Sequence, residues 1–168
     1  MDRGADILKP KLNDGLTSIH FAASNNDIHL LDFIFRQCEA EDVKRIVNIT
    51  NNDGWTPAHY AGTLNKFDAL NILLEHGADL SIENSNLMSC FDEVVRNDHS
   101  ELFECLWPYA KKIRRDLDKQ GSFGFIHLAA GQEGSKTLKV LLAKCKESPN
   151  QICNNHDLAT PLHFAILS

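Results

Sequence analysis

Four histidines recur inside similar short segments along the chain. Imidazole nitrogens bind zinc and also act as general acids and bases, so a regular set of histidines raises the question of a metal or catalytic site. Equivalent groups on stacked helical units lie about 8–10 Å apart, whereas zinc ligands each lie about 2 Å from the metal. We therefore interpret the set as structural rather than as a shared metal site. It comprises His20, His59, His127 and His163.

The remaining reactive residues form no recognisable chemical site. Cys153 and His156 have a ligand-like spacing, but no second pair accompanies them. The five cysteines are odd in number and widely spaced, which favours free thiols over a disulfide framework. There is no phosphate-binding glycine loop, dinucleotide fingerprint or HExxH sequence. We predict no catalytic residue, no metal ion and no cofactor, and hence no enzyme.

Charge gathers in one basic run and one acidic run. The basic run, 111–115, has two interpretations: cations that follow a helix C-terminus and offset its dipole, or a nuclear-import or phosphate-binding cluster. The first is favoured because Asp116 and Asp118 follow directly. The acidic run, 39–42, is expected to be a solvated face in an inserted helix or loop.

The composition is that of a folded protein. Hydrophobic residues make up 43% and charged residues 24% of the 168 residues, far from the composition of a disordered chain. The net charge of -6 argues against nucleic acid and anionic membranes, and no apolar stretch is long enough for membrane insertion. We expect no secretory signal, and a monomer in the cytoplasm, with the nucleus as an alternative.

The histidine segments are copies of one repeat. Counted at the histidine position, with Asp92 taking that position in a degenerate copy, successive members lie 39, 33, 35 and 36 residues apart. The segment 56–61 reads Thr-Pro-Ala-His-Tyr-Ala and 160–165 reads Thr-Pro-Leu-His-Phe-Ala. Residues 71–80 continue the pattern with a helix and a closing Gly-Ala-Asp turn. This repeat resembles the ankyrin repeat, a unit of about 33 residues with a Thr-Pro-Leu-His-x-Ala core.

Each residue type in the second copy has a local physical role. The Thr56 hydroxyl can cap a helix, and Pro57 then occupies the first helical position, where no amide bond is lost. Ala61 is small enough for close helix packing. Gly77 suits a left-handed helix C-cap, and the Asp53-Gly54 pair marks a tight turn. The expected unit is a helix, a short turn, a second helix and a β-hairpin-like finger.

The predicted fold is therefore an all-α ankyrin-repeat solenoid of about five units in one domain. About six residues are inserted within 37–49, and Pro108 should kink or end a helix. The last unit is incomplete, either because the array was cut from a longer one or because it ends in a half-repeat, whose open face could support self-association. The third unit lacks the signature residues but keeps apolar residues for stacking at Leu87, Phe91, Val94, Leu102, Phe103 and Leu106. The unit boundaries are 12–50, 51–83, 84–118, 119–154 and 155–168.

The resemblance implies a protein or peptide partner, held on the concave surface made by finger tips and first helices. Four large apolar residues share one finger position: Leu16, Trp55, Met88 and Phe123. They either form an exposed binding stripe or pack against the next finger, and a segment with apolar and basic side chains would suit the exposed stripe. The predicted binding residues are Leu16, Asn52, Asp53, Trp55, Leu64, Met88, Arg96, Gln120, Phe123 and Gln132.

The function that this reading implies is a non-catalytic adaptor or scaffold. The alternative is a targeting or regulatory ankyrin segment of a larger enzyme or channel, whose chemistry lies outside these residues. Fold alone does not choose between them.

Overall fold

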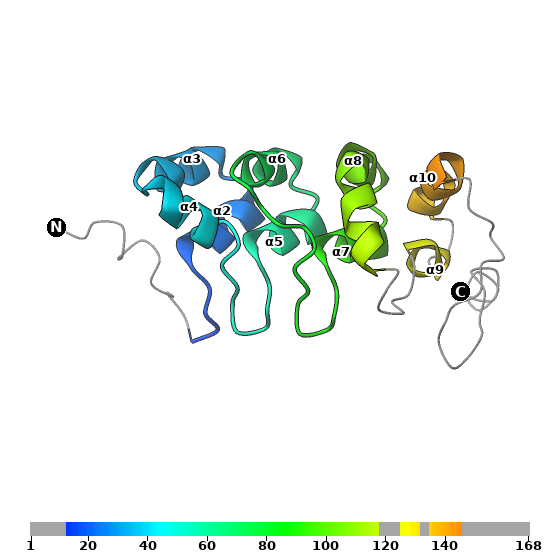
Figure 1. Cartoon of the computed structure of the whole chain (residues 1–168), viewed down its shortest axis with the longest axis horizontal. Helices are drawn as coiled ribbons and strands as arrows, with labels where there is room; N and C mark the ends of the chain where they lie inside the picture. The colour runs from blue at the N-terminus through cyan, green and yellow to red at the C-terminus, as the bar shows by residue number, and fades with distance from the viewer. Residues whose placement is uncertain (1–12, 118–124, 132–134, 146–168) are drawn as a thin grey trace. The chain divides into compact units, whose positions relative to one another are not determined.

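A computed structural model describes residues 13–117, 125–131 and 135–145 of the chain (Figure 1). Every regular element among these residues is a helix; the described part holds one isolated antiparallel bridge, between Glu83 and Ser89. The chain divides into two compact units, residues 1–90 and 91–168. The predicted all-α fold is confirmed. The fifth repeat, 155–168, lies outside the described residues.

The first unit contains two helix pairs and one extra helix. The pairs are α2 (Ser18–Asn25) with α3 (Ile28–Arg36), and α5 (Pro57–Thr63) with α6 (Phe67–Glu75). Helix α2 packs against α5, and α3 packs against α6, so the pairs stack side by side (Figure 1). The core between them is built from small residues on α2 and α5 and larger ones on α3 and α6: Ala22, Ala23, Ala58, Ala61, Leu31, Ile34, Leu70 and Leu73.

The predicted helix signals of the second repeat are confirmed. The Thr56 hydroxyl accepts a hydrogen bond from His59 N, and Pro57 begins α5. Ala61 is fully buried. Gly77 has a φ of 91°, and the next amide, Ala78 N, donates back to Leu73 O over 2.9 Å. That bond closes α6 with a Schellman turn.

The insertion predicted after the first repeat forms a separate helix, α4 (Ala40–Ile46). Ile46 and Val47 are buried at and just after its end. Asn48 then connects the insertion to the second repeat: its side-chain oxygen accepts from Asp79 N over 2.8 Å, and its amide donates to Gly77 O over 3.2 Å. The insertion is therefore tied to the closing turn of α6.

The first helices of three repeats end at equivalent residues in the left-handed conformation. Asn26, Asn65 and Asp98 have φ of 57°, 55° and 54°. Short polar side chains tolerate this conformation better than most others. Asn26 also accepts from Ala69 N near the start of α6 over 2.9 Å, so one residue ends its own helix and caps the next repeat's second helix.

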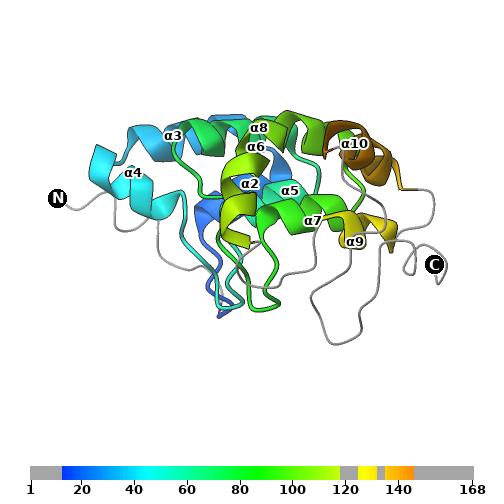
Figure 2. The same cartoon turned by 45° about the vertical axis from the view of Figure 1, so that its right-hand side comes forward.

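The second unit contains α7 (Cys90–Arg96, which begins at the unit boundary), α8 (Ser100–Leu117), α9 (Phe125–Ala130) and α10 (Lys136–Cys145). Helix α10 packs against both α8 and α9; Figure 2 shows this part from a second direction. The core includes Phe91, whose ring meets Phe103 edge-on at 6.1 Å. The other buried apolar residues include Val94, Val95, Leu102, Leu106 and Leu141.

Asp98 repeats the capping role of Asn26 with a carboxylate. Its oxygens accept from Thr137 N and Ser135 Oγ at 2.8 and 2.9 Å and from Lys136 N at 3.1 Å, at the start of α10. Burial by itself would raise the pKa of Asp98, but these hydrogen bonds outweigh it and hold the pKa below its usual range.

One expectation from the sequence is contradicted in part, and two are wrong. Pro108, expected to kink or end its helix, does not end it, because α8 continues through it to Leu117. The basic run 111–115 consequently lies within α8 rather than beyond a helix end. Leu87, expected among the stacking residues, is 76% exposed. It lies in a loop, ahead of the helix that carries the buried apolar face.

Candidate functional site

Three loops, which we call fingers, lie side by side in the first unit (Figure 1). They comprise residues 13–17, 51–56 and 83–89, and each leads directly into a first helix or the turn before it. In the second finger, Asn51 N donates to Trp55 O over 2.9 Å, and Gly54 N donates to Asn51 O over 3.1 Å. The Asn51 side-chain oxygen accepts from Asp53 N and Trp55 N at 3.0 and 2.8 Å. The buried Asn51 side chain thus fixes the backbone conformation of the second finger.

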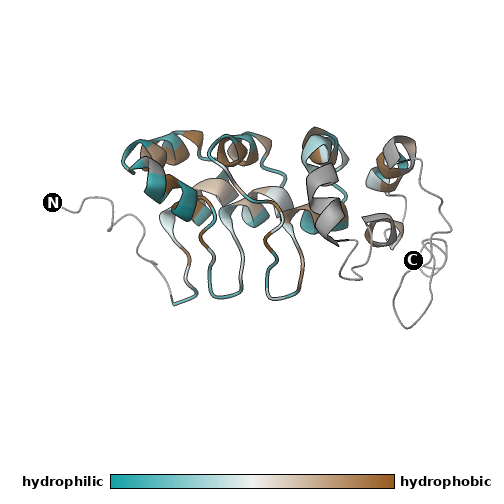
Figure 3. Ribbon diagram, in the orientation of Figure 1, coloured by the Kyte–Doolittle hydropathy of each residue, from teal (hydrophilic) through white to brown (hydrophobic). Residues whose placement is uncertain are grey.

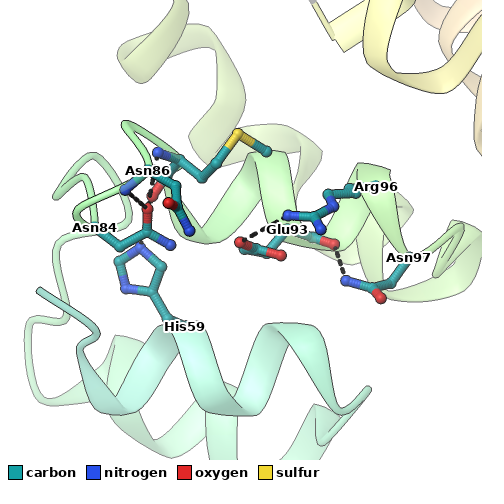
Figure 4. A network of polar contacts seen from close by, with 7 residues as sticks. His59, Asn84, Asn86, Glu93, Arg96 and Asn97 are labelled. Atoms are coloured by element: carbon teal, nitrogen blue, oxygen red, sulfur yellow. Dashed lines mark hydrogen bonds and ion pairs between the residues drawn. The ribbon is translucent and has the colours of Figure 1, made fainter. Parts of the chain in front are cut away.

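The third finger uses the same frame. Asn84 N donates to Met88 O, and Leu87 N donates to Asn84 O, both over 2.9 Å. The Asn84 side-chain oxygen accepts from Asn86 N and Met88 N at 2.9 and 3.1 Å (Figure 4). Since the backbone groups are bonded internally, the side chains at the tip are presented on a fixed frame.

Backbone hydrogen bonds join each finger to the next. Asn52 N donates to Asp14 O, and Ser85 N donates to Asp53 O, both over 2.9 Å. The Asn52 side chain adds a 2.7 Å bond to Asn13 O. The turns of the first two fingers each have a glycine that lies against the following finger. A Cβ at Gly15 would come within 2.6 Å of the Asn52 side chain, and a Cβ at Gly54 within 3.1 Å of the Asn84 backbone. The three fingers therefore form one continuous surface.

The two described histidines of the repeat anchor the bases of the fingers. His59 Nδ1 accepts from Thr56 N over 3.1 Å, and His59 Nε2 donates to Met88 O over 3.0 Å; Figure 4 shows this ring pointing toward the third finger. His20 makes the equivalent bonds to Thr17 N and Trp55 O at 3.2 and 3.1 Å. Since both ring nitrogens are used, the structural interpretation is confirmed for this pair.

Burial lowers the pKa of both His20 and His59. A proton on Nδ1 would also face the amide that Nδ1 accepts from, so the bonds require the neutral ring with its hydrogen on Nε2. The other two histidines, His127 and His163, have no described side chain. Among the described residues, no group of three or more metal-binding side chains comes together.

The finger residues predicted from the sequence to bind a partner differ in how exposed they are. Asn52 and Asp53 are exposed at the tip of the second finger. Leu16, Trp55 and Met88, of the predicted stripe, are each half-buried. The Trp55 ring lies 5.2 Å from the Tyr60 ring and 5.7 Å from His59, so it both packs on α5 and keeps an accessible part.

The other predicted residues lie elsewhere. Leu64 is at the far end of α5 and is 47% exposed. Arg96 ends α7 in the second unit, where it is exposed and lies 3.8 Å from the buried Glu93 carboxylate (Figure 4). Gln120, Phe123 and Gln132 lie outside the described residues. A binding role stays a prediction for all ten.

Sequence reasoning missed two residues of the finger surface. Leu87 occupies the turn position that Gly15 and Gly54 hold in the other fingers, and like them it has a positive φ, of 57°. Aligning 84–89 with 51–56 exposes this substitution, but the leucine was assigned to the core because it is apolar. Figure 3 shows the consequence: the second finger is mainly hydrophilic, whereas the third has a hydrophobic stretch.

Tyr60, on α5, is the second missed residue, and its pKa reflects the negative charge of the neighbouring fingers. Burial raises its pKa, and the nearby carboxylates Asp14 and Asp53 raise it further. The hydroxyl accepts a 3.1 Å bond from the Asn51 amide, which ties it to the second finger. No lysine or arginine occurs in the three fingers, which hold Asp14, Asp53 and Glu83. The finger surface is therefore acidic.

None of the helices in the described part of the chain combines the length and apolar character needed to cross a bilayer. Among the residues that the structure describes, Cys38 and Cys105 carry free thiols. Cys90 is buried and bonds to Ala58 O over 3.1 Å, while burial raises the pKa of Cys38. Both effects disfavour a reactive thiolate at these two cysteines.

Three larger proteins align with this chain over part of their length. The human transient receptor potential cation channel subfamily A member 1 is 25% identical over 126 residues, which cover 75% of this chain and 11% of the channel. The Arabidopsis thaliana potassium channel AKT2/3 is 26% identical over 161 residues, which cover 96% of this chain and 18% of that protein. The putative ankyrin repeat protein FPV031 of fowlpox virus (strain NVSL) is 33% identical over 87 residues, which cover 51% of this chain and 24% of that protein.

The chain thus matches less than a quarter of the length of each of these relatives. Residues 2–84 match the family described as ankyrin repeats (3 copies). That match covers the first two fingers and both helix pairs of the first unit, where the histidine and threonine of the repeat make their expected bonds. The chain belongs to the ankyrin-repeat family.

Proposed function

We propose that this chain is a recognition module that holds a segment of another protein on the surface formed by its fingers and first helices. Ankyrin repeats are in general non-catalytic modules that bind proteins. One observation supports the location most directly: the backbone groups of the fingers are bonded to each other, and Asn52, Asp53 and Leu87 project from that frame into solvent. A fixed frame lowers the entropy lost on binding.

The test compares proteins captured from cell lysate by the parent chain and by a double variant of the proposed surface. Asp53→Arg and Leu64→Arg are suitable because both side chains are exposed and neither holds another residue in place. Phe33→Ala is the matched control, because Phe33 is 53% exposed but lies on the second helix α3, away from the fingers. Circular dichroism checks the fold of each variant.

We expect mass spectrometry to find a specific protein with the parent and with Phe33→Ala, and to find it depleted at least tenfold with the double variant. Equal capture by all three proteins would contradict the proposed location. Loss with Phe33→Ala alone would move the binding surface to the second helices.

A second candidate is that the chain is the ankyrin segment of a larger protein whose activity lies elsewhere. The alignment to two channel proteins, covering 75% and 96% of this chain, supports it. Sequencing the transcript on both sides of these codons tests it. An open frame that continues into a membrane-spanning region is the expected result, and stop codons at both ends would reject this candidate.

We further propose that the module acts as a monomer in the cytoplasm or nucleus, without binding nucleic acid. The free thiols of Cys38 and Cys105 and the net charge of -6 support this. Light scattering during size-exclusion chromatography should give the mass of one chain, and a fluorescent fusion should stay inside the cell. A dimer mass would instead support self-association.

A further inference from the structure

Leu87 stands out because its backbone and its side chain are both in unfavourable places. Its φ of 57° is a conformation that glycine adopts freely, and the equivalent residues of the first two fingers are glycines. For leucine this conformation is strained. The side chain is also 76% exposed, the largest exposed fraction among the large apolar residues that the structure describes. Neither packing nor backbone preference explains a leucine at this turn.

The surroundings of Leu87 define the chemistry that would cover it. Met88, the next residue, is half-buried and extends the apolar area. The neighbouring finger, joined through the Ser85 N to Asp53 O bond, carries the exposed carboxylate of Asp53. Asp14 lies one finger further along, and neither carboxylate forms an ion pair with a described residue. An apolar projection beside uncompensated negative charge is complementary to an apolar side chain beside a positive one.

From this we infer that Leu87 is an anchor of the binding surface, where it contacts an apolar side chain of a partner segment whose neighbouring lysine or arginine faces Asp53 and Asp14. This inference rests on the proposed function and narrows it to a basic, partly apolar segment of a partner protein. A second copy of this chain fits less well, because its own fingers are acidic. The strained leucine is then retained for binding at a cost in stability.

The first test uses thermal unfolding to distinguish a residue that serves binding from one that packs within the chain. Leu87→Gly and Leu87→Asn both relieve the backbone strain, and asparagine does so without the extra flexibility of glycine in the unfolded chain. If Leu87 serves binding, both variants unfold at the parent's midpoint temperature or up to about 3 °C above it. A fall of several degrees in both variants would show that Leu87 packs within the chain and would overturn the inference.

The second test uses a displayed library of random peptides, twelve residues long, selected on the full chain. Peptides enriched on the parent should carry leucine, methionine or phenylalanine within a few positions of lysine or arginine. Their affinity should fall about tenfold or more on Leu87→Asn and stay unchanged on Phe33→Ala. On an Asp14→Asn, Asp53→Asn double variant, which keeps the Asp14 side-chain oxygen that accepts from Leu16 N, the preference for basic residues should disappear.

The outcomes distinguish this inference from the proposed function. Peptides that lose affinity for Asp53→Arg, Leu64→Arg but bind Leu87→Asn normally would leave the finger surface as the site and remove Leu87 from it. Enriched peptides that are acidic, or that keep their basic preference on the Asp14→Asn, Asp53→Asn variant, would overturn the proposed partner chemistry. Peptides that bind every finger variant equally would reject the finger surface itself.

Discussion

The second and third fingers share one hydrogen-bonding frame and differ at its turn. Asn51 and Asn84 are both buried and bond the same pair of amides, two and four residues further along. Gly54 occupies the left-handed turn position of the second finger, and Leu87 occupies that of the third. Because these hydrogen bonds fix the shape of the finger, the turn residue can be replaced for a functional reason at a moderate cost in stability.

The largest effect should come from removing the frame asparagines, one at a time. Asn51→Ala and Asn84→Ala each deprive two finger amides of their acceptor, so we expect each to lower the free energy of unfolding by about 2–3 kcal/mol. Urea denaturation followed by circular dichroism measures this loss. The control is Asn71→Ala, an exposed asparagine bonded only to Glu75, which should change stability by less than about 0.5 kcal/mol. A large loss at only one finger would show that the two frames are not equivalent.

The next effect distinguishes contact from backbone strain at the turn of the second finger. Gly54→Ala places a Cβ 3.1 Å from Asn84 Cα and from Ser85 N, at a φ of 76°, so we expect a loss of about 2–3 kcal/mol. Gly77→Ala is the matched control, with a φ of 91° and nothing within 4 Å of the added atom. It should lose only the strain, about 1 kcal/mol. Equal losses in the two variants would mean that the fingers separate easily.

The opposite sign is expected at the third finger. Leu87→Gly removes about 1–2 kcal/mol of strain and adds about 0.4–1 kcal/mol of unfolded-state entropy, so the net gain is about 0.5–1 kcal/mol. The same urea titration checks it. A more stable Leu87→Gly variant together with a less stable Gly54→Ala variant would show that glycine serves the fold at the second finger, whereas leucine at the third finger does not.

The smallest expected effect is the pH dependence from the histidines at the finger bases. The folded pKa values of His20 and His59 lie below the unfolded value of 6.5, so the unfolded chain binds more protons once the pH falls through that value. Stability is therefore full above pH 6.5 and falls as the pH decreases toward the folded values. Urea midpoints between pH 8 and 5 measure it. A flat profile in the parent would contradict the direction of these two pKa shifts.

The sequence predicted the repeat well because its signals are local. Thr56, Pro57 and Gly77 act on their own helix ends, so their types and spacing indicate the element directly. The same local reasoning expected Pro108 to kink or end its helix, and it does not end it, because the long helix α8 continues through it. Of the site, Asn52 and Asp53 were placed correctly at an exposed tip, because turn residues are usually exposed.

The repeat period, the capping residues of the second repeat and the structural role of the recurring histidine depend on residues within one repeat, so the amino-acid sequence was enough to predict them. The exposure of Leu87, the effect of Asp14 and Asp53 on Tyr60, and the capping of the next repeat's helix by Asn26 became visible only in the folded structure. The Asn26 cap joins residues 43 positions apart, Tyr60 is affected by a carboxylate of the preceding finger, and Leu87 has a positive φ that its apolar side chain does not predict. Contacts between neighbouring repeats and the backbone conformation of the third finger produce these features. The sequence pattern within one repeat does not reveal them.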